Sequence, residues 1–290
     1  MSILSRNRLK AYGFLLLNAA FWGFAAPIIK FSLDYTTPNL FLLYRFLIAT
    51  ILFLPFYLVY RKKIKTKTKP LLLLSLALLG TPLTLLPLFY GLNLTTSIEG
   101  SILEASSPLF IILGGLLFLR ERMSLKEWLG FGITLIGTSL LTFEPVITGH
   151  SFTSISLTGN FLIIISNIIW ASFLLIAKKY KTDTIELTFY SFLISIPFFF
   201  FLALTEGSLI PNRLAIPGIV YMATFGSIVA FWAYTEGQKY IEASEAAIFT
   251  YLRPVFALPL ALLWLKEPMS PIAIASLIII TFGVFRCQKR

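Results

Sequence analysis

Two stretches of this chain repeat one another: PLFIILGGLLFLRERMS at Pro108–Ser124 and PVFALPLALLWLKEPMS at Pro254–Ser270. They lie 146 residues apart, and eight of their seventeen positions are identical. The similarity extends along the chain at the same offset, or at 148 in the first apolar run. The matched pairs are Gly91 and Gly237, Tyr44 and Tyr190, Phe46 and Phe192, Gly137 and Gly283, Trp22 and Trp170, and Lys30 and Lys178. The chain therefore contains two copies of one unit, residues 1–146 and 147–290.

The composition of the 290 residues is that of a membrane protein. Hydrophobic residues make up 57% of the chain, charged residues make up 13%, and the mean hydropathy is +0.85. A single soluble core would not bury that much apolar surface, whereas a hydrocarbon layer about 30 Å thick requires helices of about 20 apolar residues. We therefore expect an all-α integral protein of the cell membrane, which in a bacterium is the inner membrane.

Apolar runs separated by charged residues or by Gly and Pro predict ten membrane-spanning helices. The predicted ranges are 9–31, 38–60, 70–91, 95–119, 124–144, 155–178, 184–204, 214–235, 243–264 and 270–286. Each copy of the repeat then has five helices. Because five is odd, the second copy enters the membrane from the opposite side, and the repeat is inverted. Inverted halves are a device for alternating access, although repetition is also what gene duplication alone would leave.

The positions of lysine and arginine predict the orientation in the membrane, because basic loops stay on the cytoplasmic side. A cytoplasmic N-terminus places 19 of the 24 basic residues on that side. Lys30, Arg213 and Lys266 then lie outside, and Arg45 and Arg253 lie within spans. We therefore expect both termini in the cytoplasm. The net charge of +11 reflects this topology, and no basic face interleaved with aromatic residues indicates nucleic-acid binding.

Residues suited to catalysis are scarce in the sequence. The only histidine, His150, lies in a predicted outer loop, and the lone cysteine, Cys287, offers neither a disulfide nor a metal cluster. No GxxxxGK[ST] phosphate loop occurs. We expect neither an enzyme nor a bound cofactor. A channel would show rings of like charge or a filter loop, and neither is evident in the sequence. A non-transporting subunit of a larger complex is the remaining alternative.

The repeat and several motifs resemble the EamA-type permeases of the drug/metabolite transporter (DMT) superfamily over nearly the whole chain. The motifs are the LRERMS and LKEPMS ends of the repeated block, the helices NAAFWGFAAPIIK and SNIIWASFLLIAK, and the turn FYGLNLTTSIEGSIL. The resemblance implies an exporter or exchanger of small metabolites, such as amino acids or related compounds, with a cavity between the halves. Efflux of toxic amphiphiles is the alternative.

Charged residues within the predicted spans are functional candidates, because the hydrocarbon region penalises them by several kcal/mol. Glu104 and Arg253 each lie about 15 Å into their helices, near the midplane. Their places in the repeat put them on the same helical face, so they either line the cavity or form a structural ion pair. Arg45 lies at a similar depth and is a further partner. Apolar surroundings make Glu104 the candidate for coupling transport to protons.

Aromatic and amide side chains complete the predicted cavity. Asn18 and Trp22 on the first helix, and Asn167 and Trp170 on the sixth, each place an aromatic ring beside an amide. Such pairs suit a substrate with flat and polar parts, or else pack between helices. The family resemblance adds three candidates around the cavity: Tyr90, Trp232 and Tyr251. Tyr90 lies near a span end and also fits an interface anchor.

Two prolines, Pro108 and Pro254, occupy matched positions in the fourth and ninth predicted helices. Each frees a backbone carbonyl and bends its helix. We therefore expect kinks at both positions, and we expect these kinks to act as hinges when the two helices open and close.

Overall fold

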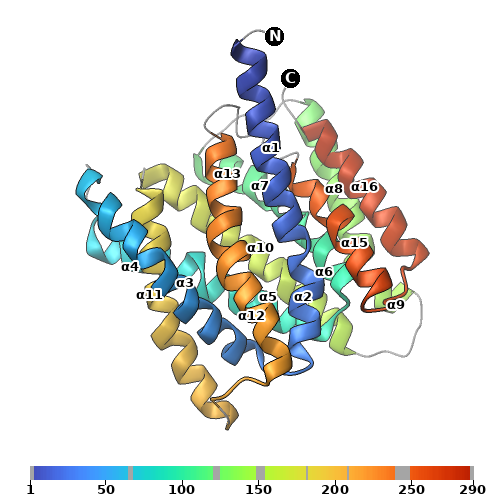
Figure 1. Cartoon of the computed structure of the whole chain (residues 1–290). Helices are drawn as coiled ribbons and strands as arrows, with labels where there is room; N and C mark the ends of the chain where they lie inside the picture. Colours follow the sequence, from blue (N-terminus) through green and yellow to red (C-terminus); the bar gives the residue numbers. More distant parts are fainter. Residues whose placement is uncertain are drawn as a thin grey trace.

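The structure is a computed structural model, and it describes residues 3–64, 68–119, 125–147, 154–180, 182–207, 209–238 and 249–287. No strand occurs among these residues. The elements up to residue 147 are α1 (Ile3–Gly23), α2 (Ala25–Leu33), α3 (Pro38–Tyr60), η1 (Arg61–Lys63), α4 (Pro70–Gly80), α5 (Pro82–Leu94), α6 (Ser97–Glu104), α7 (Ser107–Leu119), α8 (Leu125–Thr142) and α9 (Glu144–Ile147). The elements beyond it are α10 (Ser154–Tyr180), α11 (Thr184–Ala203), η2 (Leu204–Glu206), η3 (Arg213–Ala215), α12 (Ile216–Tyr221), the π-helical η4 (Met222–Val229), α13 (Ala230–Gln238), η5 (Phe249–Leu252), α15 (Arg253–Leu263) and α16 (Pro271–Cys287). These elements pack as a bundle in which α1 begins and α16 ends at the same end (Figure 1).

Seven helical segments of the described residues are long and apolar enough to cross a membrane. They are Asn7–Leu33, Pro38–Tyr60, Pro70–Leu94, Ser97–Gly115, Ser156–Ala177, Thr184–Glu206 and Arg213–Tyr234. Three shorter apolar helices, Trp128–Leu141, Arg253–Leu263 and Pro271–Gly283, fall within the other three predicted ranges. The helical fold class is therefore confirmed, and the crossing of the bilayer by all ten segments stays a prediction.

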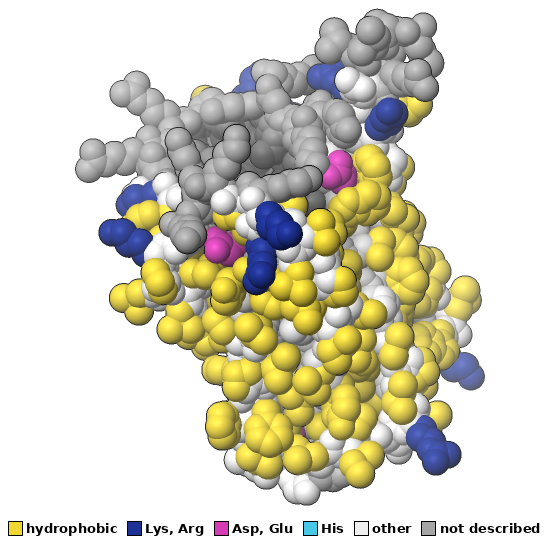
Figure 2. Space-filling model, turned by 60° about the vertical axis from the view of Figure 1, so that its left-hand side comes forward, with side chains coloured by type: hydrophobic (Ala, Val, Ile, Leu, Met, Phe, Trp, Pro, Cys, Tyr) yellow, Lys and Arg dark blue, Asp and Glu magenta, His cyan; other side chains and the backbone are white. Residues whose placement is uncertain are grey.

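The exterior of the bundle is apolar. On the face drawn in Figure 2, hydrophobic side chains cover the middle of the molecule, and most of the Lys and Arg side chains lie toward the end where α1 begins. Large apolar side chains face outward along the helices: Ile51, Phe201 and Leu263 are 67%, 67% and 81% exposed. In water such a surface would drive association, so it is the surface of a protein that lies in lipid.

Helices of the two repeat copies are interleaved. Extensive contacts join α8 to α16, α3 to α11, α5 to α10 and α1 to α13. At the contact of α3 with α11, the rings of Phe46 and Phe192 lie 5.6 Å apart between centroids. These two phenylalanines are repeat equivalents of each other, 146 residues apart. Because each phenylalanine contacts its own repeat equivalent, the axis that relates the two copies passes through this contact.

Glycines at repeat-related positions make related contacts. Gly91 on α5 packs so closely on α10 that a Cβ there would lie 2.7 Å from Cγ1 of Ile163. Gly237 on α13 packs on α1, where a Cβ would lie 2.7 Å from Cγ of Leu15. The glycines are 146 residues apart and their partners are 148 apart. Small residues at such contacts let two helices approach closely in a membrane protein.

The same two helix pairs are joined by repeat-related hydrogen bonds. Nδ2 of Asn18 on α1 donates to the carbonyl oxygen of Ala230 at 2.8 Å. Oγ of Ser166 on α10 donates to the carbonyl oxygen of Thr84 at 2.8 Å. Donors and acceptors again follow the offsets of 148 and 146. The packing of α1 on α13 and the packing of α10 on α5 are thus built alike.

Several predicted spans are interrupted rather than continuous. The helix breaks at Phe24, at Thr81 and at Ala105–Ser106, in each case one to three residues before a proline. A proline lacks the N–H that would extend the hydrogen-bond ladder, and it disfavours a helical conformation for the residue before it. Pro87, Pro197 and Pro259 instead lie inside helices that run on past them.

Candidate functional site

Three charged side chains from the predicted spans come together inside the bundle. Glu104 is the last residue of α6, and Arg253 is the first residue of α15. These two helices pack side by side, and the carboxylate interacts electrostatically with Arg253 and, more weakly, with Arg45 on α3. Glu104 remains partly exposed, and its carboxylate accepts no hydrogen bond from the described residues. A carboxylate in this position is available to a solute, a proton or water.

Arg45 is held by the irregular turn of η4. Its side chain is 7% exposed, and Nε donates to Oγ of Ser227 at 3.0 Å. The π-helical turn leaves the Ser227 hydroxyl free to donate to the carbonyl of Met222, five residues earlier. The repeat equivalents of Arg45 and Ser227 are Ser191 and Thr81, which are also joined, by a bond of 2.9 Å from Oγ1 of Thr81 to the Ser191 carbonyl. The contact of Thr81 with Ser191 therefore corresponds to the contact of Ser227 with Arg45, with an uncharged serine in place of the arginine.

Trp22 is fixed at both its face and its edge. The guanidinium carbon of Arg253 lies 4.3 Å from the centroid of the Trp22 ring, a distance at which the ring's negative face attracts the cation. Nε1 of Trp22 donates to the Gly226 carbonyl at 2.9 Å. Asn18 on the same helix is 2% exposed, and its side-chain amide donates to the Ala230 carbonyl. Of this predicted pair, Trp22 lies beside the charges, and the contacts of Asn18 are packing contacts.

Asn167 spans the break between α6 and α7. Its Nδ2 donates to the Leu103 carbonyl at 2.8 Å, and its Oδ1 accepts from Oγ of Ser107 at 2.9 Å. Oγ of Ser107 is also 2.6 Å from the Glu104 carbonyl, which lies four residues before Pro108 and so lacks its helical donor. The predicted kink at Pro108 thus coincides with a real break, held by polar groups of α10. Pro254, at the start of α15, follows the 3₁₀ turn η5.

The hydrogen bonds of Asn167 lead to a test. In the Asn167→Leu variant each lost hydrogen bond is expected to cost about 1 kcal/mol, which lowers the melting temperature of the purified protein. Asn18→Leu is the matched control in α1; its partner carbonyl lies within regular helix, so a smaller loss is expected. A larger loss in the control would contradict this assignment.

Two of the other predicted aromatic residues pack against aromatic rings. Trp170 packs on Phe173, with 5.1 Å between ring centroids, beside an apolar cluster of α4, α10 and α11. Trp232 is 48% exposed and meets Phe14 edge to face. Tyr251 lies in η5, and its side chain is outside the part that the structure describes. The ring contacts that the structure describes for Trp170 and Trp232 are therefore with other aromatic rings.

Tyr90 belongs to a polar cluster at the end of the bundle opposite the termini. Its hydroxyl accepts a hydrogen bond of 2.9 Å from Nδ2 of Asn39 and lies 3.4 Å from Oε1 of Glu206. Glu206 also accepts from Nδ2 of Asn39 at 2.6 Å and from the hydroxyl of Thr37. The cluster ties α3 and α5 to the end of α11.

Two charged residues of that same end were not among the predicted site residues. Glu267 accepts hydrogen bonds from the start of α6, and Nζ of Lys30 donates to the carbonyls at the end of α5. Glu267 belongs to the repeated block, which is a signal that its position matters. Its partners lie about 170 residues earlier in the chain, and no local pattern in the sequence reveals such a distant contact.

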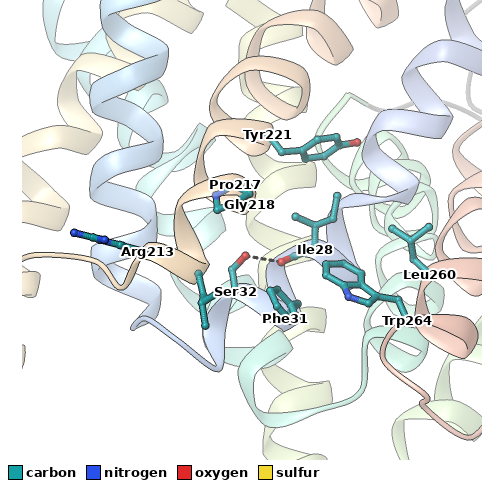
Figure 3. A pocket seen from close by; sticks show the side chains of 10 residues that line it. Ile28, Phe31, Ser32, Arg213, Pro217, Gly218, Tyr221, Leu260 and Trp264 are labelled. Carbon is teal, nitrogen blue, oxygen red and sulfur yellow. Dashed lines mark hydrogen bonds between the residues drawn. The ribbon is translucent and has the colours of Figure 1, made fainter.

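A groove of about 460 Å³ lies apart from the charged site. It is lined by α2, α12 and α15, largely through apolar side chains, and the rings of Phe31 and Trp264 at its edge are 4.5 Å apart between centroids. Figure 3 shows that the guanidinium of Arg213 points away from the other lining residues. The groove thus contains none of the predicted site residues. Among the described residues, no three His, Cys, Asp or Glu side chains are grouped to hold a metal ion.

A bundle with an apolar exterior and buried charges between its helices is a multi-pass membrane protein with a polar interior site. The model of the EamA-like transporter family matches this chain twice, at residues 9–143 and 157–286. The chain therefore belongs to the EamA-like transporter family, and the resemblance of its motifs to that family is confirmed. The two matches coincide with the two copies of the repeat.

Relatives and a solved structure agree with this family. Uncharacterized transporter YetK of Bacillus subtilis (strain 168) is 28% identical over 291 residues, 98% of this chain and 88% of the relative. Uncharacterized inner membrane transporter YedA of Escherichia coli (strain K12) is 27% identical over 293 residues, 96% of this chain and 90% of the relative. A solved crystal structure with 18% identity has a TM-score of 0.69, covering 97% of this chain and 95% of the other, a likeness of fold.

Proposed function

We propose that this protein is a secondary transporter that exports or exchanges small metabolites, such as amino acids or related compounds, by alternating access. Its two halves, residues 1–146 and 147–290, lie inverted in the membrane, with both termini in the cytoplasm. The solute binds between them, at Glu104, Arg45, Arg253 and Trp22. The observation that carries the proposal is the meeting of these charges where helices from both halves pack together and the α6–α7 helix is interrupted.

The charges support a solute with its own polar ends. A guanidinium held over an aromatic ring binds a carboxylate without leaving its place, because the ring fixes it in advance. The partly exposed carboxylate of Glu104 would take an ammonium group or a proton. The interrupted α6–α7 helix lies beside these charges, as in transporters whose discontinuous helices meet at the midplane.

The transport function is tested by comparing the metabolites of cells with and without the protein. Solutes whose levels change are then loaded into vesicles that contain the purified protein, and counterflow of each labelled solute is measured. Saturable counterflow is expected for at least one of them. Accumulation of hydrophobic cations instead would favour efflux of amphiphiles. No movement of any solute by the purified, folded protein would favour a subunit of a larger complex.

The inverted arrangement makes a separate prediction about topology. Reporters attached to the N-terminus and to the C-terminus are both expected to be active only in the cytoplasm, because ten crossings return the chain to its starting side. A reporter inserted in the 148–153 link between the halves is expected on the outer side. Reporters show this directly in intact cells. Termini on opposite sides, or a cytoplasmic link, would contradict inversion of two five-helix halves.

A further inference from the structure

Glu267 joins the connection between α15 and α16 to the first turn of α6. Its Oε1 accepts from the backbone N–H of Ser97 at 2.9 Å, and its Oε2 accepts from Oγ of Ser97 at 2.8 Å and from the N–H of Ile98 at 3.1 Å. These N–H groups have no partner within α6, and the positive end of the helix favours an anion there. One carboxylate thus closes the start of α6 from a segment 170 residues away.

The backbone next to Glu267 is strained into the conformation that aims it. Lys266 has a φ of 54°, the only positive φ of a non-glycine residue in the part of the chain that is described. This left-handed residue reverses the chain after α15 and lets the N–H of Glu267 bond to the Ala261 carbonyl at 3.0 Å. A lysine in this conformation is strained. The hydrogen bonds of Glu267 to α6 add to the bond with Ala261 in offsetting this strain.

Lys30 holds the adjoining helix end with the opposite charge. Its Nζ donates to the carbonyls of Leu92 at 3.1 Å and of Asn93 at 2.9 Å, at the C-terminus of α5. Lys30 and Glu267 also attract one another. The tip of the α5–α6 hairpin is therefore held by a cation from α2 and an anion from the α15–α16 connection, each placed to match the helix dipole that it meets.

The contact of Glu267 lies on the two helices that carry the site charges. α6 runs from Ser97, at Glu267, to Glu104, and α15 runs from Arg253, near Glu104, toward Glu267. We propose that Glu267 is a latch that closes the end of the molecule opposite the termini. Whenever the solute site opens at that end, its bonds to α6 must break. This inference rests on the alternating-access function proposed above, and it makes α6 and α15 the pair that couples the site to the opening.

The physical character of the contact suits a latch better than a permanent joint. Glu267 is partly exposed, so water can replace the three hydrogen bonds when the helices part, and the net cost of opening stays small. An apolar contact at this place would expose its surface to water on opening, which is unfavourable, and would therefore favour the closed state. A charged group that is hydrated when released permits both states, as alternating access requires.

The test measures how readily a buried thiol is reached from outside. Cys287, the only cysteine, is changed to serine, and a reporter is introduced as Ser101→Cys. Ser101 is 3% exposed and lies on the face of α6 that bears both Ser97 and Glu104. A membrane-impermeant maleimide is added to the outer side of intact cells, and the rate of labelling is measured. Glu267→Gln is expected to speed labelling by about tenfold, because the amide keeps the size and loses the charge that strengthens these bonds.

Three further variants make the result decisive. Glu267→Asp retains the charge and is expected to stay close to the parent rate. Asp34→Asn removes an exposed carboxylate at the same end of the bundle, and its labelling rate is expected to be unchanged. Ser97→Asp places a second carboxylate against Glu267 and is expected to speed labelling even if Glu267→Gln fails to fold. Parent labelling rates in folded Glu267→Gln or Ser97→Asp protein overturn the latch.

The labelling rate and the transport rate separate this inference from the proposed function. Labelling requires no solute, so a protein that moves nothing in vesicles can still show the latch. Faster labelling without any counterflow would contradict the transport function alone. Normal counterflow together with unchanged labelling in Glu267→Gln would contradict the latch alone.

Discussion

Counterflow by the Glu104→Gln variant is expected to fall at least about tenfold and to lose its dependence on pH. Glu104 is the carboxylate that opposes two arginines within the bundle. Its removal takes away a carboxylate that attracts both cations in a region where charge is costly. Glutamine also has no proton to exchange. We therefore expect the variant to be slow at every pH, whereas the parent rate depends on pH because Glu104 exchanges a proton in the proposed mechanism.

The matched control for this experiment is Glu99→Gln on the same helix. Glu99 accepts hydrogen bonds from Oγ1 of Thr95 at 2.6 Å and from Nδ2 of Asn160 at 3.0 Å, at the far end of α6 from the arginines. The control removes one carboxylate from α6 as well, and it is expected to keep the pH profile of the parent. A flat profile in Glu99→Gln, or an unaltered rate and profile in Glu104→Gln, would show that Glu104 is only a structural partner of the arginines.

The second large effect is expected from a single methyl group at Gly91. A Cβ there would lie 2.7 Å from Cγ1 of Ile163 and 2.8 Å from the carbonyl oxygen of Gly159. The side chain can turn aside, but the backbone oxygen moves only with α10 itself. Gly91→Ala is therefore expected to force α5 and α10 apart and to destabilise the protein by about 2 kcal/mol. The measurement is the melting temperature of the purified protein in detergent.

Two other glycines provide a graded comparison. Gly237→Ala, at the repeat-related position, meets mainly the flexible side chain of Leu15, and its nearest backbone atom is the Ala11 oxygen at 3.3 Å. A smaller loss is expected there. Gly13→Ala meets nothing within 4 Å, and in the middle of α1 it is expected to be neutral or slightly stabilising. An order of stability other than Gly13→Ala, Gly237→Ala, Gly91→Ala would contradict the contacts that define the packing of the two copies.

The sequence was sufficient for the helical membrane fold, because apolar length alone reveals a span. It did not reveal where spans are interrupted. Pro108 does follow a break, but Pro87 and Pro197 lie within helices that continue. The difference lies in the neighbours. At the break before Pro108, Nδ2 of Asn167 donates to the Leu103 carbonyl and Oγ of Ser107 lies 2.6 Å from the Glu104 carbonyl, and these groups come from a distant helix as well as from the break itself.

The charges of the candidate site and one of its aromatic residues could be predicted from the sequence. Glu104, Arg45 and Arg253 are visible in the sequence because a charge within an apolar run is unusual. Trp22 and Trp170 are equivalent in the repeat, yet one lies under a guanidinium and the other packs on Phe173. The surroundings of the two tryptophans differ because neither arginine is repeated. The equivalent of Arg45 in the second copy is Ser191, and the equivalent of Arg253 in the first copy is Ser107.

The irregular turns at Thr81 and at Ser227 have a joint consequence for the architecture of the two halves. The two residues are repeat equivalents; the first copy interrupts its third helix there, and the second copy widens its eighth into a π turn. Only one of the two is followed by proline, so the irregularity belongs to the location and not to any single residue type. Each half thus contains one irregular turn at which a side-chain hydroxyl bonds to a main-chain oxygen, from Thr81 to Ala77 and from Ser227 to Met222. The two halves therefore depart from the regular helix at matched places by different routes, one through a break before a proline and the other through a π turn.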